Sequence, residues 1–133
     1  MYLLDTSIIL ELLLDQERAD EVEQLLRETQ SGRLHLTEFT LYSPGVILVR
    51  RKLPETFLQA VDELVGAAAV RLVRLLVRDM KAVADNSRRF NLDFDDAYQY
   101  TAAEKRKLEI VSFDRDFERT PKGRTTPTEI LAR

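Results

Sequence analysis

Two residue types on which functional sites often depend are absent or scarce in this chain of 133 residues. It has no cysteine, and its one histidine is His35. The lack of cysteine excludes disulfide bonds and thiolate zinc sites, and it is compatible with a reducing cytoplasm. His35 lies between Leu34 and Leu36 and is predicted to be a strand residue. A metal ion would therefore be held by carboxylate oxygens, which favours Mg2+ or Mn2+ over zinc or copper.

A long hydrophobic segment is also missing. The apolar run Ile8–Leu14 is interrupted by Glu11 and is far too short to span a bilayer. We therefore expect no membrane association and a cytoplasmic location. Because 44% of the residues are hydrophobic and no linker or repeat divides the chain, residues 1–133 are expected to form a single domain with its own core. The net charge of -3 argues against a general nucleic-acid coat.

Apolar periodicity predicts strands that alternate with helices along the whole chain. A helix is also expected to begin or kink at Ser43-Pro44, because serine followed by proline is typical of helix starts. The alternation predicts an α/β fold, with a mainly parallel sheet of four to five strands covered on both faces. The strands are expected at 1–5, 33–36, 69–75 near a sheet edge, 109–113 and, shortest, 124–126; the other helices at 8–14, 19–29, 54–65, 77–90 and 94–107.

Three aspartates follow strands or begin a helix. Asp5 follows the first strand, Asp96 lies in the first turn of the helix from Phe94, and Asp114 follows the strand 109–113. Helix starts and strand carboxyl ends meet at one edge of a parallel sheet, where such folds bind ligands. Singly, each aspartate could be an ordinary cap or turn residue. Together they would repel one another, and a bound divalent cation would remove that repulsion, so the group indicates a metal site.

The motifs around these aspartates resemble those of the PIN-domain nucleases, a family that includes the toxins of VapBC-type toxin–antitoxin modules. Leu4-Asp5-Thr6-Ser7 is similar to the opening motif of the family, and Asp96-Ala97 to its third acidic site. Val111–Phe117 is similar to the closing motif of the family, and Thr126–Glu129 is similar to its tail. Each motif is short, but three in the correct order at the correct element ends make a fairly specific match.

The resemblance implies a three-layer α/β/α sandwich and a metal-dependent endoribonuclease that hydrolyses RNA with Mg2+ or Mn2+. It carries over Asp5, Asp96 and Asp114 as catalytic metal ligands. Asp116 is similar to a further metal-binding acid in some members, although it could equally cap the turn that ends at Phe117. The implied partners are RNA, a cognate antitoxin if the protein is a toxin, and a second copy in a homodimer. The apolar helices 8–14 and 54–65 offer surfaces for pairing, and core burial explains them equally well.

One position departs from the family pattern. Members place a glutamate about two turns into the helix after the second strand, where this chain has Ser43. The nearest acid is Glu38, and a shift of five residues on a regular helix rotates a side chain by roughly 140°. We expect Glu38 to be the fourth catalytic and metal-binding carboxylate, on the condition that Thr37–Tyr42 is not regular helix. The alternative is a PIN-like RNA-binding or protein-interaction module with a degraded site.

Four further residues are predicted to contact the substrate. The hydroxyls of Thr6 and Ser112 are expected to position phosphate oxygens, although hydroxyls at helix starts more often act as caps. Arg115 and Arg119 flank Asp114 and are expected to bind phosphate without selecting sequence. A receiver-type phosphoacceptor domain is disfavoured because no pair of acids lies beside the first strand. An aspartyl phosphatase is disfavoured because Asp5-Thr6-Ser7 stands where Asp-x-Asp is needed.

Overall fold

Four strands form one parallel sheet in the computed structural model, which describes all residues from 1 to 133. In the order β3-β2-β1-β4, every neighbouring pair is parallel. The parallel sheet and the edge position of β3 confirm the prediction. The segment 124–126 adds only an isolated bridge between Thr125 and Val111, so it is not a fifth strand. The strands are β1 (Tyr2–Leu4), β2 (Leu34–Thr37), β3 (Arg71–Val73) and β4 (Glu109–Val111).

Helices connect the strands, and none of them is both long and apolar enough to cross a membrane. The α-helices are α1 (Thr6–Leu13), α2 (Ala19–Glu28), α3 (Glu38–Arg50), α4 (Pro54–Val61), α5 (Met80–Phe90), α6 (Phe94–Arg106) and α7 (Pro127–Leu131). Three further turns complete the chain: a π-helical turn η1 (Asp62–Ala67) that extends α4, and two 3-10 turns, η2 (Val77–Asp79) and η3 (Arg115–Arg119).

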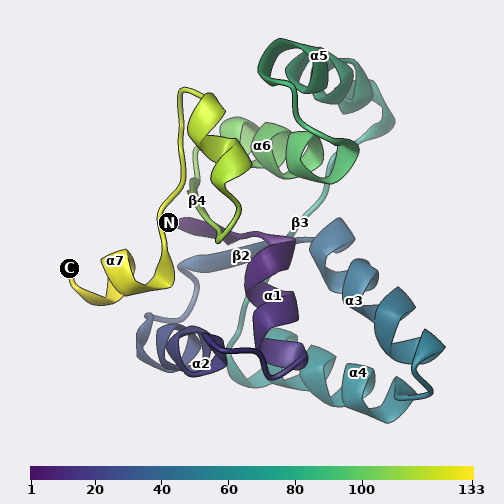
Figure 1. The fold of residues 1–133 in the computed structure, drawn as a ribbon, viewed down its shortest axis with the longest axis vertical. Coiled ribbons are helices and arrows are strands. Elements are labelled where there is room, and N and C mark those ends of the chain that lie inside the picture. The colour runs from purple at the N-terminus through teal and green to yellow at the C-terminus, as the bar shows by residue number, and fades with distance from the viewer.

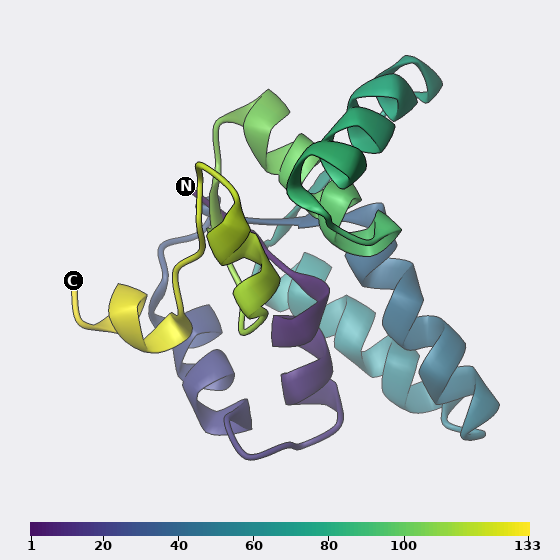
Figure 2. The same ribbon diagram turned by 45° about the horizontal axis from the view of Figure 1, so that its top comes forward.

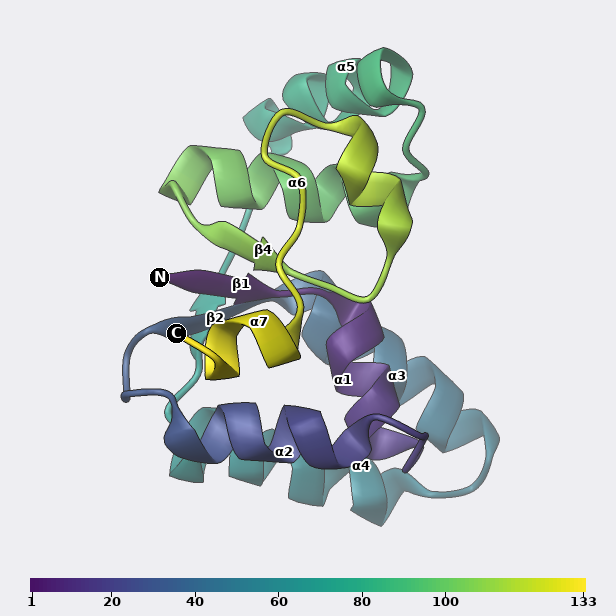
Figure 3. The same cartoon turned by 60° about the vertical axis from the view of Figure 1, so that its left-hand side comes forward.

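Alternate residues of the central strand β1 enter two different cores. Leu3 packs in a core with residues of α5 and α6, whereas Tyr2 and Leu4 pack in a second core with residues of α1 and α2. Figures 1 and 3 show α5 and α6 on one side of the sheet and α2, α4 and α7 on the other. Because successive side chains of a strand point to opposite faces, this arrangement gives the expected three-layer α/β/α sandwich.

Helix α3 begins earlier than predicted. The Thr37 hydroxyl at the end of β2 accepts a hydrogen bond from the Thr40 amide at 3.1 Å, and the helix continues from there to Arg50 with Pro44 inside it. Of the two alternatives expected at Ser43-Pro44, a helix start there was wrong, and Pro44 instead lies inside a helix that begins earlier. The threonine cap and the burial of Thr40, Leu41 and Leu48 against the fold outweigh the local preference of Ser43-Pro44 for a helix start.

The carboxyl ends of β1, β2 and β4 lie side by side at one edge of the sheet. Figure 2 shows the segment after β4, which leads into η3, lying against the start of α1. Two hydrogen bonds hold this contact: the Phe113 amide donates to Ser7 Oγ at 3.1 Å, and the Asp5 amide donates to the Val111 carbonyl at 2.9 Å. Helix α6 packs against η3, so segments far apart in sequence meet at this edge.

Candidate metal centre

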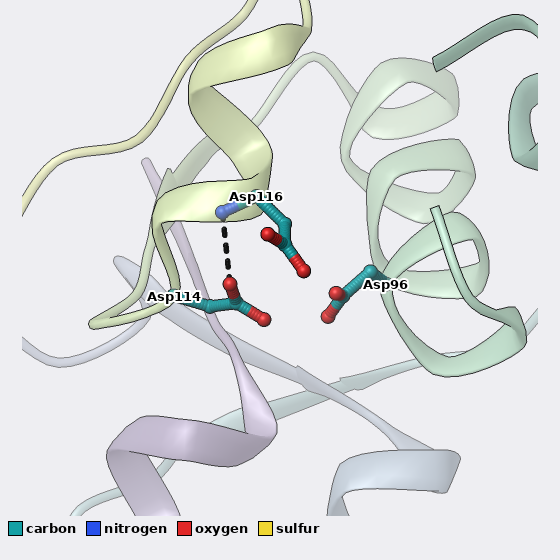
Figure 4. A group of neighbouring side chains, drawn as sticks. All are labelled: Asp96, Asp114 and Asp116. Atoms are coloured by element: carbon teal, nitrogen blue, oxygen red, sulfur yellow. Dashed lines mark hydrogen bonds between the residues drawn. The ribbon is translucent and has the colours of Figure 1, made fainter. Parts of the chain in front are cut away.

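Three carboxylates point toward one another at this edge of the sheet (Figure 4). One carboxylate oxygen from each of Asp96, Asp114 and Asp116 lies within 4.8 Å of the other two. Asp96 is presented by the first turn of α6, which Asp93 caps by accepting from the Asp96 amide at 2.9 Å. Asp114 follows β4 and caps η3 by accepting from the Asp116 amide at 2.8 Å. The cap of this turn is therefore Asp114, and the Asp116 carboxylate faces the group.

Asp5 lies behind this group and is almost completely buried, with 2% of its surface exposed. Its Oδ2 accepts hydrogen bonds from Ser7 Oγ at 2.9 Å and from Ser112 Oγ at 2.8 Å. Its Oδ1 is buried and has no hydrogen-bond partner. Burial raises the pKa of Asp5 from 3.8 to about 6. An unsatisfied buried carboxylate oxygen is costly, and a bound cation would offset that cost.

The charges at this edge repel one another. The pKa of Asp96 lies well above its ordinary value. Burial is the main cause, and a hydrogen bond with the Asp114 carboxylate and the nearby charge of Asp5 raise the pKa further. Of these acids only Asp116 forms an ion pair, between its Oδ1 and Arg119 Nη1 at 2.9 Å. Such a set of carboxylate oxygens fits a hard divalent cation, which would also favour the ionised form of each acid.

Glu38 is held outside this group. Its Oε1 accepts a hydrogen bond from the Tyr98 hydroxyl at 2.5 Å, and Arg74 Nε lies 3.3 Å from its Oε2. Burial, together with the hydrogen bond to Glu38, raises the pKa of Tyr98 to about 12. The expected irregularity of Thr37–Tyr42 was wrong, because α3 is helical from Glu38 onward. A metal-binding role for Glu38 stays a prediction, and it would require the loss of both contacts.

A buried polar network supports the metal centre from beneath. Gln99, fully buried on α6, donates through Nε2 to Thr40 Oγ1 at 2.6 Å and to Asp95 Oδ1 at 3.2 Å. Its Oε1 accepts from the Thr37 hydroxyl at 3.1 Å. Thr6, which is also buried, lies 3.0 Å from Thr40 Oγ1 and 3.4 Å from Asp95 Oδ1. The network joins the starts of α1, α3 and α6 and orients the turn that carries Asp96.

Sequence reasoning missed Gln99, although a signal for it exists. It is the one amide in the buried run from 97 to 103, between apolar and small residues on either side. A polar side chain in such a run must find partners inside the fold. Its partners lie on β2, α1 and α3, at positions that the spacing within α6 does not indicate.

The predicted substrate-binding residues differ in how accessible they are. Ser112 is fully buried, and its hydroxyl joins Asp5 to the Asp114 amide, which donates to it at 2.9 Å. This hydroxyl therefore positions two acids and does not face solvent. Arg119 is engaged with Asp116 and with the carbonyls of Phe90 and Asn91 at 3.1 and 2.6 Å. Arg115 is exposed beside Asp114 and makes no ion pair.

Comparisons with known proteins identify the family and the fold. The family model of the PIN domain matches residues 2–123. A toxin–antitoxin complex from Klebsiella pneumoniae contains a similar chain, with a TM-score of 0.73, 19% identity, and 96% of this chain and 98% of that chain covered. VapC20 of Mycobacterium tuberculosis gives a TM-score of 0.78 at 17% identity, with 94% and 98% covered. FitAcB of Neisseria gonorrhoeae gives 0.69 at 17% identity, with 96% and 99% covered.

These structures share the fold over almost the whole length of each chain. Among curated protein sequences none matches significantly. The family model covers nearly all of the chain and includes every carboxylate described above. The chain therefore belongs to the PIN-domain family.

Proposed function

We propose that this protein is a metal-dependent endoribonuclease that hydrolyses RNA phosphodiester bonds with Mg2+ or Mn2+. The observation that carries the proposal is the group of Asp96, Asp114 and Asp116, whose oxygens lie within 4.8 Å of one another. The buried Oδ1 of Asp5, which has no hydrogen-bond partner, is a second observation that fits a bound cation. Membership of the PIN-domain family supports the proposal, as does the similarity to VapC20, which is described as a sarcin-ricin loop cleaving toxin.

Each residue of the centre has a distinct role in this proposal. Asp96, Asp114 and Asp116 would hold the ion, with Asp5 beside them. A bound divalent ion polarises a phosphate and lowers the pKa of a coordinated water. Asp5 Oδ1, which is buried and has no hydrogen-bond partner, would add a ligand oxygen on the inner side of the ion. The exposed guanidinium of Arg115 is placed to bind a phosphate of the substrate.

We further propose that the protein acts in the cytoplasm as the toxin of a toxin–antitoxin module. The similar chain in the toxin–antitoxin complex from Klebsiella pneumoniae supports this role. An antitoxin is expected to cover apolar surface. A hollow of about 600 Å3 is lined mostly by hydrophobic residues of α1, α2, α4 and η1. A homodimer stays a prediction, and sedimentation of the purified protein would test it.

Cleavage of single-stranded RNA is the direct test of the proposed activity. The purified protein should cut a labelled RNA with Mn2+ present and should stop when the ion is chelated. Asp114→Asn, which keeps the size of the side chain and an acceptor oxygen for the Asp116 amide, should not cut. Equal cleavage by the wild-type protein and Asp114→Asn would contradict the proposal, because the activity would then come from a contaminant or from another site.

One alternative has a specific observation in its favour. Ser43 occupies the position of the expected glutamate, and the nearest acid, Glu38, is bound to Tyr98 and Arg74. A site with one acid fewer could bind RNA or a protein without cutting RNA. Calorimetric titration with Mn2+ combined with an RNA-binding assay separates the two functions. A binding module would bind RNA with unchanged affinity after the ion is removed and would never cleave it.

A further inference from the structure

Aromatic side chains gather beside the metal centre, on a surface that the catalytic proposal does not use. Of the ten Phe and Tyr residues, only Tyr42 and Phe94 are exposed, at 54% and 55%. The ring of Phe94 lies 6.0 Å from that of Phe39 and 6.1 Å from that of Tyr98, and the last two are 5.8 Å apart. Tyr42 lines the same hollow as Phe39 and Tyr98. We call these four residues the aromatic platform.

The platform adjoins the carboxylates through the backbone. Phe94 is the first residue of α6 and stands two residues before Asp96, in the same turn. The neighbouring hollow has a volume of about 400 Å3 and is lined by Glu38, Phe39, Tyr42, Ser43, Val46 and Tyr98. This volume lies in the range of small-ligand sites. Glu38 and Phe39 begin α3 directly after β2, and Phe94 begins α6, so the platform lies at the same edge of the sheet as the carboxylates. An RNA strand with a phosphate at the metal centre can extend along this edge to the platform.

We propose that the aromatic platform stacks an unpaired nucleobase of the RNA strand, next to the nucleotide whose phosphate is at the metal centre. The inference rests on the proposed function and adds to it a subsite for one unpaired base. Stacking on an aromatic side chain is tolerant of sequence, because every base has a π face. The Phe94 ring packs against Phe39 and Tyr98, so little freedom is lost when a base binds.

The polar groups around the platform suit a nucleotide. The Arg74 side chain is 65% exposed, and its Nε lies 3.3 Å from Glu38; its outer face can meet a backbone phosphate. The Ser43 hydroxyl and the Glu38 carboxylate line the hollow and can form hydrogen bonds with the edge of a base. A second copy of the chain or an antitoxin would instead bury the wider apolar surface that continues along α3 to Val46 and Val49.

The absence of tryptophan makes a direct test possible. Phe94→Trp creates a protein with a single tryptophan in the platform, and Leu58→Trp creates a matched protein at a site of similar exposure, 57%, on α4. Each is titrated, with the metal chelated, with a single-stranded RNA and with an abasic oligonucleotide of the same length and charge. Stacking should quench the fluorescence of Phe94→Trp with the RNA but not with the abasic strand. Leu58→Trp should respond to neither strand.

Cleavage kinetics give a second measurement. Phe94→Leu keeps an apolar side chain but removes the aromatic face, so KM should rise about tenfold, a change within the range measured for base stacking, with kcat nearly unchanged. Leu58→Ala should leave both constants unchanged. Circular dichroism shows whether each variant folds. If Phe94→Trp does not fold, the KM of Phe94→Leu still tests the stacking site.

Failure of this inference is distinguishable from failure of the proposed function. Quenching by RNA in a protein that never cleaves would retain the stacking site and reject the nuclease. Cleavage by the wild-type protein with an unchanged KM in Phe94→Leu, or equal quenching by RNA and the abasic strand, would reject the stacking site. A concentration-dependent dimer that Phe94→Leu dissociates would also reject it, because the platform would then be an interface between copies.

Discussion

Acidic side chains occur in two neighbouring places at the same edge of the sheet, and their surroundings differ. Glu38 has its charge compensated by Arg74 and its other oxygen bonded to Tyr98. Asp5, Asp96 and Asp114 form no ion pair, and burial raises the pKa of both Asp5 and Asp96. Glu38 has a positive counter-charge inside the fold, whereas Asp5, Asp96 and Asp114 have none and Asp5 Oδ1 lacks any hydrogen-bond partner; a bound cation would supply both. The difference predicts that a cation binds at the three aspartates more readily than at Glu38, whose metal-binding role stays a prediction.

The largest effect is expected from the removal of one uncompensated charge. Asp96→Asn should lower Mn2+-dependent cleavage by at least about 1,000-fold, or about 4 kcal/mol, because carboxylates that share an ion act as a unit. Without metal, the same variant should be at least as stable as the wild-type protein, since it relieves repulsion. Asp85→Asn, at a surface site paired with Lys81 and Arg88, is the control and should retain activity. A loss of folding in Asp96→Asn would mean that the acid is structural.

The stability of the metal-free protein should depend on pH through Asp5. Its pKa rises from 3.8 to about 6 on folding, so the contribution of Asp5 to stability is fully present below about pH 4 and is lost as the pH rises through about 6. The rise corresponds to about 3 kcal/mol. Asp5→Asn should therefore increase the free energy of unfolding at pH 8 by up to this amount and should flatten its pH dependence. Urea unfolding from pH 4 to 8 measures both effects, with the exposed Asp62→Asn as control.

Loss of the buried network beneath the metal centre should change the free energy of unfolding less than removal of the repulsion among the aspartates. Gln99→Leu removes one hydrogen-bond partner from each of Thr37, Thr40 and Asp95, and lost buried hydrogen bonds are costly, so the free energy of unfolding should fall by about 2 kcal/mol. Gln24→Leu, on the exposed face of α2, should change it by less than about 0.5 kcal/mol. Chemical unfolding compares the two variants, and equal effects would show that the network contributes nothing specific.

The smallest effect is expected at the compensated acid. Glu38→Gln keeps an oxygen that accepts from Tyr98 and loses only the attraction to the exposed Arg74, so stability should fall by less than about 1 kcal/mol. Mn2+ affinity should stay within about twofold of the wild-type value. Calorimetric titration with Mn2+ of this variant and of Asp96→Asn compares the contributions of the two acids to metal affinity. A loss of affinity as large as that of Asp96→Asn would restore Glu38 as a metal ligand.

Element ends were predictable from the sequence, and partners across the fold were not. Asp5, Asp96 and Asp114 could be placed because strand ends and helix starts follow from apolar periodicity and turn residues. The start of α3 was missed because Ser43-Pro44 is a strong local signal for a helix start. The actual cap is Thr37, and its position depends on where β2 ends. The pairing of Glu38 with Arg74 and Tyr98 joins three separate elements, and no local pattern encodes it.

Diffraction from crystals soaked in Mn2+, recorded at a wavelength where manganese scatters anomalously, tests the central claim most directly. We expect one anomalous peak between the carboxylates of Asp96, Asp114 and Asp116, with Asp5 Oδ1 facing the ion or one of its waters, and with Glu38 still bound to Tyr98. A peak beside Glu38, or no peak at a Mn2+ concentration that supports cleavage, would contradict the account.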